Sequence, residues 1–248
     1  MITIVGVKGI PLIKKGDDLA RIIVEAAARQ GIVMRDGDTI VVSHKIVSKA
    51  EGNVLNLKDV NPSPVSLRLA KSMAEDPRHV EAILREARGV VKIVERHMIL
   101  ETKHGFVCAN AGVDRSNMEG SEWVSLLPKD PDRSARTIRE GIKKALGCNV
   151  AVIVSDTFGR PWRIGQVNVA IGVAGMIPIK DYRGKGDMFQ HILRVTMIAI
   201  ADELASAAEL VMNKSDGVPV AVISGYSYPR GEGSARELVR PREKDLFR

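Results

Sequence analysis

The chain contains 248 residues, of which 45% are hydrophobic and 27% are charged, and it has a net charge of +7 at pH 7. A chain of this length buries roughly 70–75% of its unfolded surface, so it folds without disulfides or a structural metal. The composition excludes an intrinsically disordered protein. The lack of any uncharged apolar run of about 18 residues excludes a membrane-spanning helix.

Two cysteines, Cys108 and Cys148, are the only thiols in the sequence. Neither belongs to a CxxC or Cys/His pattern, which disfavours a zinc site and fits a reducing compartment. The first residues, MITIVGVKG, do not show the basic and then apolar pattern of a secretory signal. We therefore expect a cytoplasmic protein with no membrane segment.

The positive net charge favours anionic partners, which include nucleic acids, nucleotides and acidic metabolites. Aromatic residues make up only 4% of the chain, and the lysines and arginines are scattered rather than clustered into a basic arm. Proteins that bind single strands place aromatic platforms along a basic groove. We therefore expect no nucleic-acid partner.

The first part of the chain predicts a strand, a helix and a second strand. Residues 2–7 alternate weakly, Asp17 is a suitable cap for a helix that ends at Gly31, and residues 39–42 have the composition of a strand. Residues 9–14, GIPLIK, are apolar between two lysines. They fit a cover for a nucleotide base or a closure of the core, and taken alone they favour the core.

Residues 43–52 are expected to be extended. Lys45 and Lys49 would then share one face with Val47 and aim two ammonium groups in the same direction. A polyphosphate would match this arrangement. A solvated strand edge protected by lysines would match it equally well, so both interpretations remain open.

Two helices are predicted to begin at Ser63-Pro64 and Asp76-Pro77, because each pair places a capping side chain before a proline of the first turn. Strands over 90–94 and 99–102 form a hairpin pattern. A basic amphipathic helix is expected over 134–146, closed by a glycine. These elements are interpreted as scaffold.

Residues 106–117, FVCANAGVDRSN, predict a strand of small residues that ends in polar side chains. Asp114 and Asn117 are ordinary turn residues. Alternatively, Asp114 is the partner of Asp156 in a cation site, because two acids that lie side by side in a partly buried place repel each other unless a cation lies between them.

The stretch from Asn149 to Arg163, NVAVIVSDTFGRPWR, is the most chemically unusual part of the chain. Its apolar run predicts a strand buried on both faces, which stops at Asp156. Asp156 and Thr157 offer the oxygen ligands that Mg²⁺ or Mn²⁺ takes, and Arg160 and Arg163 suit phosphate or carboxylate groups. The simpler interpretation is a strand end followed by a polar loop with a surface ion pair.

The last third predicts a strand over 165–175 and a strand over 220–224. Asp187, with Gln190 three residues on, resembles the start of a long helix that runs from Met188 to about Met212. The sequence contains no Walker motif, no GxGxxG and no GxSxG.

Taken together, five blocks resemble the coenzyme F420-0:L-glutamate ligases, GTP-dependent enzymes of archaea and some bacteria. The blocks follow the family's order over nearly the whole chain, which is far more specific than any one short pattern. They are GIPLIKKGDDLA at 9–20, VSKAEG at 47–52, NAGVDRSN at 110–117, SDTFGRPWRIG at 155–165 and DGVPVAVISG at 216–225.

The resemblance implies a set of site residues. It implies that two divalent cations, Mg²⁺ or Mn²⁺, are held by Asp114, Asp156 and Thr157, and it leaves a potassium ion open. It implies GTP contacts from Ile10, Pro11, Leu12, Ile13, His44, Lys45, Lys49 and Asn117, and from a later loop that contains Met212, Asn213, Asp216, Gly217 and Val218.

That later loop departs from the family pattern. The family usually has Met-Gly-Glu where this chain has Met212-Asn213-Lys214, and the loop here is one residue shorter. A lysine therefore replaces a carboxylate beside the expected cations. This substitution bears on the second cation site and on the nucleotide preference.

The reaction that the resemblance implies passes the γ-phosphoryl group of GTP to the terminal carboxylate of coenzyme F420-0. The amine of L-glutamate then attacks the resulting acyl phosphate. We expect Arg160 and Arg163 to act as clamps on the phosphodiester or on the developing charge. The implied fold is α+β, with mixed sheets, flanking helices and two interleaved lobes in a single unit over 1–248, and the family favours a homodimer.

Two other functions use the same residues. A metal-dependent GTP or phosphate-ester hydrolase would need the same carboxylates and lysines. A non-catalytic nucleotide sensor or RNA-binding module would bind its ligand independently of divalent cations, and salt would weaken that binding steeply.

Overall fold

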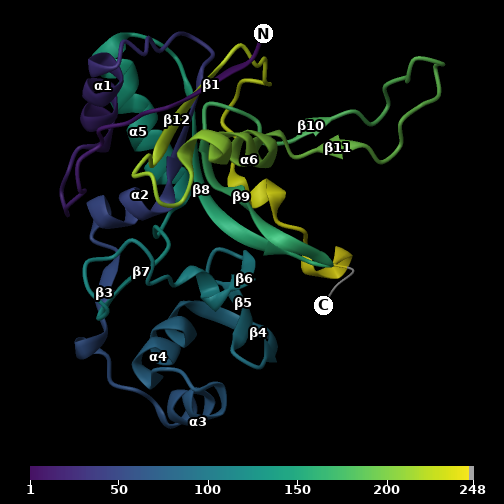
Figure 1. Cartoon of the computed structure of the whole chain (residues 1–248). Helices are drawn as coiled ribbons and strands as arrows, with labels where there is room; N and C mark the ends of the chain where they lie inside the picture. Colours follow the sequence, from purple (N-terminus) through teal and green to yellow (C-terminus); the bar gives the residue numbers. More distant parts are fainter. Residues whose placement is uncertain (246–248) are drawn as a thin grey trace.

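The computed structural model describes residues 1–245 and is built around a five-stranded sheet with the strand order β1-β12-β2-β8-β9 (Figure 1). Only β2 and β8 run parallel, and the other neighbours are antiparallel. The strands are β1 (Thr3–Gly6), β12 (Val220–Ser224), β2 (Thr39–Ser43), β8 (Ala151–Arg160) and β9 (Arg163–Ala174).

Helices cover both faces of this sheet. Helices α1 and α5 lie together on one side and α6 lies on the other (Figure 1). The β-branched residues of β2 and of the first half of β8 are therefore buried on both faces, as the sequence predicts. The helices are α1 (Leu19–Arg29), α5 (Pro131–Leu146) and α6 (Ile200–Met212).

A second lobe lies between α2 (His44–Glu51) and α5 in the chain and has its own buried cluster, which includes Leu57, Ile83 and Leu100. Two short sheets and two helices build it (Figure 1). Its elements are β3 (Val54–Asn56), α3 (Pro64–Met73), α4 (Pro77–Glu86), β4 (Ala87–Val94), β5 (His97–Thr102), β6 (Val107–Ala109) and β7 (Trp123–Ser125). The mixed α+β class predicted from the sequence is confirmed.

Short elements complete the chain. The 3-10 helices are η1 (Leu57–Asp59), η2 (Asn110–Gly112), η3 (Ala235–Leu238) and η4 (Arg242–Lys244). No helix within residues 1–245 has the length and apolarity needed to cross a membrane.

The local signals at several helix ends are confirmed. Ser63 and Asp76 accept hydrogen bonds from the first turns of α3 and α4, each with a proline at the start. Asp18, one residue after the expected Asp17, caps α1. These caps satisfy backbone N–H groups that have no partner inside the helix.

Residues 43–52 are not extended, because His44–Glu51 form helix α2. His44, Val47 and Ser48 are buried at helical spacing, and this stripe outweighs the alternation of Lys45, Val47 and Lys49. Gly52 adopts the left-handed conformation that ends helices. Lys45 and Lys49 still point the same way, since residues four apart share a helix face.

The prediction of a long helix that begins at Met188 is wrong at its start, because α6 begins at Ile200. Residues 180–198 form a projecting arm in which β10 (Lys180–Asp181) pairs with β11 (Met197–Ile198) (Figure 1). Asp187 Oδ1 accepts from the backbone N–H groups of Phe189 and His191, so its side chain fixes a tight turn at the arm's tip instead of capping a helix.

Strand β8 does not stop at Asp156 but continues to Arg160. Its partner β9 begins at Arg163, so the pairing partner extends across the whole polar stretch. A register irregularity falls between Val154 and Ser155, immediately before the first carboxylate. Bulges of this kind re-aim the side chains that follow them.

Candidate functional site

A cavity of about 830 Å³ opens where β2 ends and β8 leaves the core. Most of the residues expected to bind ligands line it, although they come from five separate parts of the chain. They are Ile10, Pro11, Leu12, Ile13, His44, Lys45, Lys49, Asp114, Asn117, Asp156, Thr157, Met212, Asn213, Gly217 and Val218.

Sheet register explains why the first of these residues meet. Ser43 and Ser155 are partners in the parallel pair of β2 and β8, so His44 and Asp156 follow side by side, where β2 ends and the parallel pairing with β8 stops. His44 Nε2 lies 3.1 Å from Asp156 Oδ1, in a contact whose angle is outside hydrogen-bond geometry. Ligand sites in open sheets with parallel strands form at this kind of edge.

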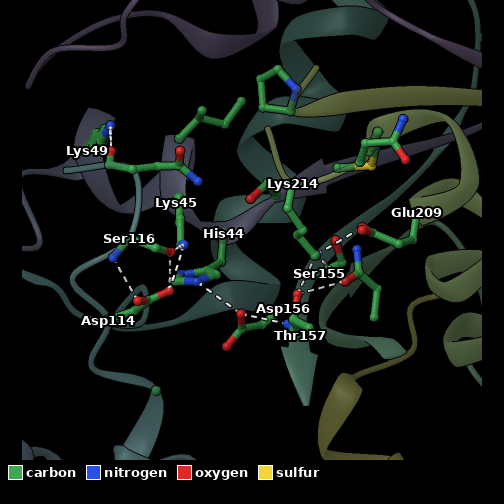
Figure 2. A pocket seen from close by; sticks show the side chains of 18 of the residues that line it. His44, Lys45, Lys49, Asp114, Ser116, Ser155, Asp156, Thr157, Glu209 and Lys214 are labelled. Carbon is green, nitrogen blue, oxygen red and sulfur yellow. Dashed lines mark hydrogen bonds and ion pairs between the residues drawn. The ribbon is translucent and has the colours of Figure 1, made fainter. Parts of the chain in front are cut away.

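Lys45 and Asp114 form the left half of the cavity in Figure 2. Their Nζ and Oδ2 atoms are 2.6 Å apart, and Ser116 contacts both side chains. Burial alone raises the pKa of the Asp114 carboxyl, but the Lys45 ammonium and the Ser116 donors outweigh it and hold this pKa below its ordinary value. Asp114 is therefore a carboxylate at neutral pH.

Lys49 lies one helical turn beyond Lys45 and donates to the backbone oxygen of Asn117 at 2.7 Å. Burial, together with the neighbouring charge of Lys45, lowers the pKa of Lys49. Two ammonium groups that repel each other in this way would both be stabilised by a bound polyanion.

Thr157 forms the right half of the cavity with Lys214, which the sequence analysis placed beside the expected cations, and with Asn168 and Glu209, which sequence reasoning missed. Its hydroxyl donates to Asn168 Oδ1 at 2.8 Å, and Lys214 Nζ lies 2.5 Å from the same hydroxyl (Figure 2). Glu209 and Asn168 also accept from Lys214. Asn168 is the one polar residue in the run 167–174 of β9, VNVAIGVA, and this interruption was the signal in the sequence that could have identified it.

The strand pleat separates the two halves. Asp156 and Thr157 are consecutive residues of β8, so their side chains point to opposite faces of the strand. The Asp156 carboxylate therefore lies toward α2, and the Thr157 hydroxyl toward the loop after α6.

Three expected site residues lie elsewhere. Asp216 does not line the cavity, and its carboxylate accepts from Asn213 Nδ2 at 2.8 Å within the loop. Arg160 and Arg163 also lie outside the cavity lining, at the turn between β8 and β9. Arg160 Nη2 donates weakly to the Ile164 oxygen at 3.4 Å. This chain does not bring either arginine to its own cavity.

The carboxylates suit a divalent cation that a ligand helps to hold. Asp114 and Asp156 face one cavity, and within residues 1–245 the Asp156 Oδ2 atom makes no hydrogen bond. The described residues contain no group of three or more His, Cys, Asp or Glu side chains placed for a metal. Mg²⁺ is commonly bound by one or two carboxylates plus substrate phosphates, so this donor set fits.

Cys108 also lines the cavity, but it is not a nucleophile. Burial, and secondarily the charge of Asp156, raises the pKa of its thiol to about 12. A thiol in this environment stays protonated at neutral pH, and reactivity requires the thiolate. The chemistry of the site therefore rests on its ammonium groups, carboxylates and backbone.

Fold and site together define an α+β protein whose large cavity combines ammonium groups and carboxylates. Residues 7–225 match the family described as F420-0:Gamma-glutamyl ligase, and the chain belongs to this family.

Three relatives are similar over nearly their full length, and each is named coenzyme F420:L-glutamate ligase. The relative from Methanothermobacter thermautotrophicus is 47% identical, over 100% of this chain and 99% of its own. That from Methanocaldococcus jannaschii is 45% identical, over 96% and 94%. That from Methanopyrus kandleri is 43% identical, over 98% and 97%.

Proposed function

We propose that this protein is a GTP-dependent ligase of coenzyme F420 biosynthesis that joins L-glutamate, through an amide bond, to the terminal carboxylate of coenzyme F420-0. The observation that supports this most strongly is the cavity itself. In a chain of this ligase family, two distant carboxylates and two lysines converge there beside the strand that carries the family's SDTFGRPWRIG block.

The chemistry requires activation, because joining a carboxylate to an amine in water is uphill. A carboxylate oxygen of F420-0 attacks the γ-phosphorus of GTP, and the bond to the β-phosphate oxygen breaks, releasing GDP. The glutamate amine then attacks the acyl carbon of the acyl phosphate. The carbon–oxygen bond to phosphate breaks, and the amine releases one proton to solvent. No step needs a protein nucleophile.

The residues of this cavity supply alignment and charge compensation, which dominate phosphoryl transfer. We assign the GTP phosphates to the side of Lys45 and Lys49, whose ammonium groups share one helix face. We assign the nucleotide to the space beside the 10–13 segment and the 212–218 loop, which both contribute residues to the lining.

We further propose that Asp114 and Asp156 hold a divalent cation, Mg²⁺ or Mn²⁺. When bound, such a cation neutralises phosphate charge and orients the triphosphate. Asp114 is paired with Lys45 at 2.6 Å, so the carboxylate is already held in a charged, oriented state before any cation arrives. The expected second cation would use Thr157.

The test is mass spectrometry of F420-0 incubated with the protein, GTP, Mn²⁺ and L-glutamate. We expect glutamyl units to be added, and GTP to be consumed only when F420-0 and glutamate are both present. GTP loss at an equal rate without either acceptor would instead identify a hydrolase. Nucleotide binding without any turnover would identify a sensor.

We also propose that the protein is a homodimer located in the cytoplasm. The arm over 180–198 projects from the molecule and exposes apolar side chains such as Met188, Phe189 and Val195 (Figure 1). A second copy is the partner that would cover them. In such a dimer Arg160 and Arg163 would serve as clamps only if they reached the partner's cavity.

Sedimentation analysis tests the assembly. We expect the wild-type chain to sediment as a dimer and the double variant Phe189→Ser, Val195→Ser to shift to a monomer. A wild-type monomer would refute the assembly, and a double variant that dimerises as tightly as wild type would refute the role of the arm.

A further inference from the structure

The ammonium of Lys214 contacts side-chain oxygens from three different elements, while the lysine side chain as a whole is 56% exposed (Figure 2). Its Nζ atom lies 2.5 Å from Thr157 Oγ1 of β8, 3.0 Å from Asn168 Oδ1 of β9 and 2.9 Å from Glu209 Oε2 of α6. A shell of hydroxyl, amide and carboxylate oxygens is also what a hard metal cation would take. The lysine occupies that shell itself.

The Thr157 hydroxyl both donates and accepts a hydrogen bond within the cluster formed by Thr157, Asn168, Glu209 and Lys214. Its hydroxyl proton is donated to Asn168 Oδ1, so the oxygen lone pairs face the ammonium. Asn168 is 3% exposed and cannot turn outward without breaking its place in β9. A metal bound at Thr157 would have to displace Lys214 or lie next to its positive charge.

The loop after α6 holds Lys214 in this position. Asn213 has a positive φ of 50° combined with an extended ψ of 176°, and its side-chain amide donates to Asp216 Oδ2 at 2.8 Å. Glu209 lies one turn before the end of α6 and balances the lysine charge. The positive charge of Lys214 and the negative charge of Glu209 therefore balance each other without a bound ion.

We propose that the Lys214 ammonium takes the place of a second divalent cation beside Thr157, so that this chain binds a single divalent cation, at Asp114 and Asp156. The inference rests on the proposed function and deepens it, because the cation that the ammonium replaces is the second of the two expected beside the nucleotide. A tethered cation needs no ion from solution, unlike a metal, which must be bound and partly dehydrated.

The test counts Mn²⁺ ions per chain, by electron paramagnetic resonance of unbound Mn²⁺ during titration of the full-length protein. We expect one tight site in the wild type. We expect a second site, at least tenfold tighter than any weak second binding of the wild type, in Lys214→Glu, which replaces the ammonium by a metal ligand. Lys214→Gln keeps the experiment interpretable if the glutamate variant does not fold.

The matched control is Lys144→Glu, which makes the same charge change at an exposed position of α5 and should leave the count at one. Two equivalent sites in the wild type would overturn the inference. A single Mn²⁺ site in both folded Lys214 variants would also overturn the inference, because it would show that the lysine does not exclude the second ion. A gain in Lys144→Glu equal to that in Lys214→Glu would also overturn it.

The count is independent of catalysis. If F420-0 gains no glutamate but the Mn²⁺ count changes as expected, the proposed function fails and the tethered cation stands. If glutamate is added but the wild type binds two Mn²⁺ ions, only the tethered cation fails.

Discussion

The two halves of the cavity use the same kinds of groups in opposite ways. On the α2 side, a lysine pairs with a carboxylate at 2.6 Å, and a second carboxylate, that of Asp156, keeps one oxygen without a partner among the described residues. On the α6 side, the Lys214 ammonium donates to Thr157 Oγ1 and to Asn168 Oδ1. The half on the α2 side therefore remains able to accept a metal cation. The half on the α6 side already contains a positive charge, that of the Lys214 ammonium.

The comparison also shows how one strand serves two functions. Asp156 and Thr157 are neighbours in β8, and the pleat sends their side chains to different halves. A change at Asp156 should therefore affect catalysis, whereas a change beside Thr157 should affect the stability and cation count of the other half. Four variants separate these effects.

The largest expected effect is that of Asp156→Asn. Removing the charge while keeping the shape should lower the rate of glutamate addition by about 10³-fold or more, because the cation and developing charge lose their main ligand. Asp59→Asn, an exposed change in the second lobe, is the control. Wild-type turnover in a folded Asp156→Asn variant would refute the cation assignment.

Next in size is Lys45→Met on the same side. Losing one charge-assisted contact to a phosphate should raise the Kd for GTP by about 10- to 100-fold, as titration calorimetry would measure. Lys71→Met, at an exposed position of α3, should leave the Kd unchanged. Equal affinity in the two variants would show that the phosphates lie elsewhere.

On the opposite side, Asn168→Ala should destabilise the fold by about 1–3 kcal/mol in urea unfolding. The substitution removes a buried acceptor that both Thr157 and Lys214 use. Asn61→Ala, at an exposed loop position, should change the unfolding free energy by less than about 0.5 kcal/mol. A neutral Asn168→Ala variant would mean that the cluster contributes nothing to stability.

The smallest effect is the pH dependence of Asp114. Because the folded pKa lies below the unfolded value of about 4, its stabilising contribution should be fully present above that pH. The contribution should be lost as pH falls through the folded pKa. The side chain is 42% exposed, so the unfolding free energies of wild type and Asp114→Asn should differ by less than about 1 kcal/mol at neutral pH without metal. A difference that grows on acidification would reverse the assignment.

Much of the fold was readable from local signals. The caps at Ser63 and Asp76 and the β-branched run before Asp156 specify their elements within a few residues of sequence. The convergence of Asp114 and Asp156 on one cavity was expected as well, from the chemistry of two acids and from the family resemblance.

The errors arose where tertiary contacts decide. Helix α2 forms because His44, Val47 and Ser48 find a core to pack against, which an alternation of lysines does not reveal. The arm around Asp187 is fixed by side-chain bonds to its own backbone. Lys214 contacts side chains of three different elements, so no spacing in the sequence predicts these contacts.

Oxygen transfer tests the central claim most directly. F420-0 labelled with ¹⁸O in its terminal carboxylate should be incubated with the protein, GTP, Mn²⁺ and L-glutamate, and the released phosphate analysed by mass spectrometry. An acyl phosphate predicts one ¹⁸O atom in each phosphate and one retained in the new amide. Unlabelled phosphate accompanying glutamate addition would contradict the account.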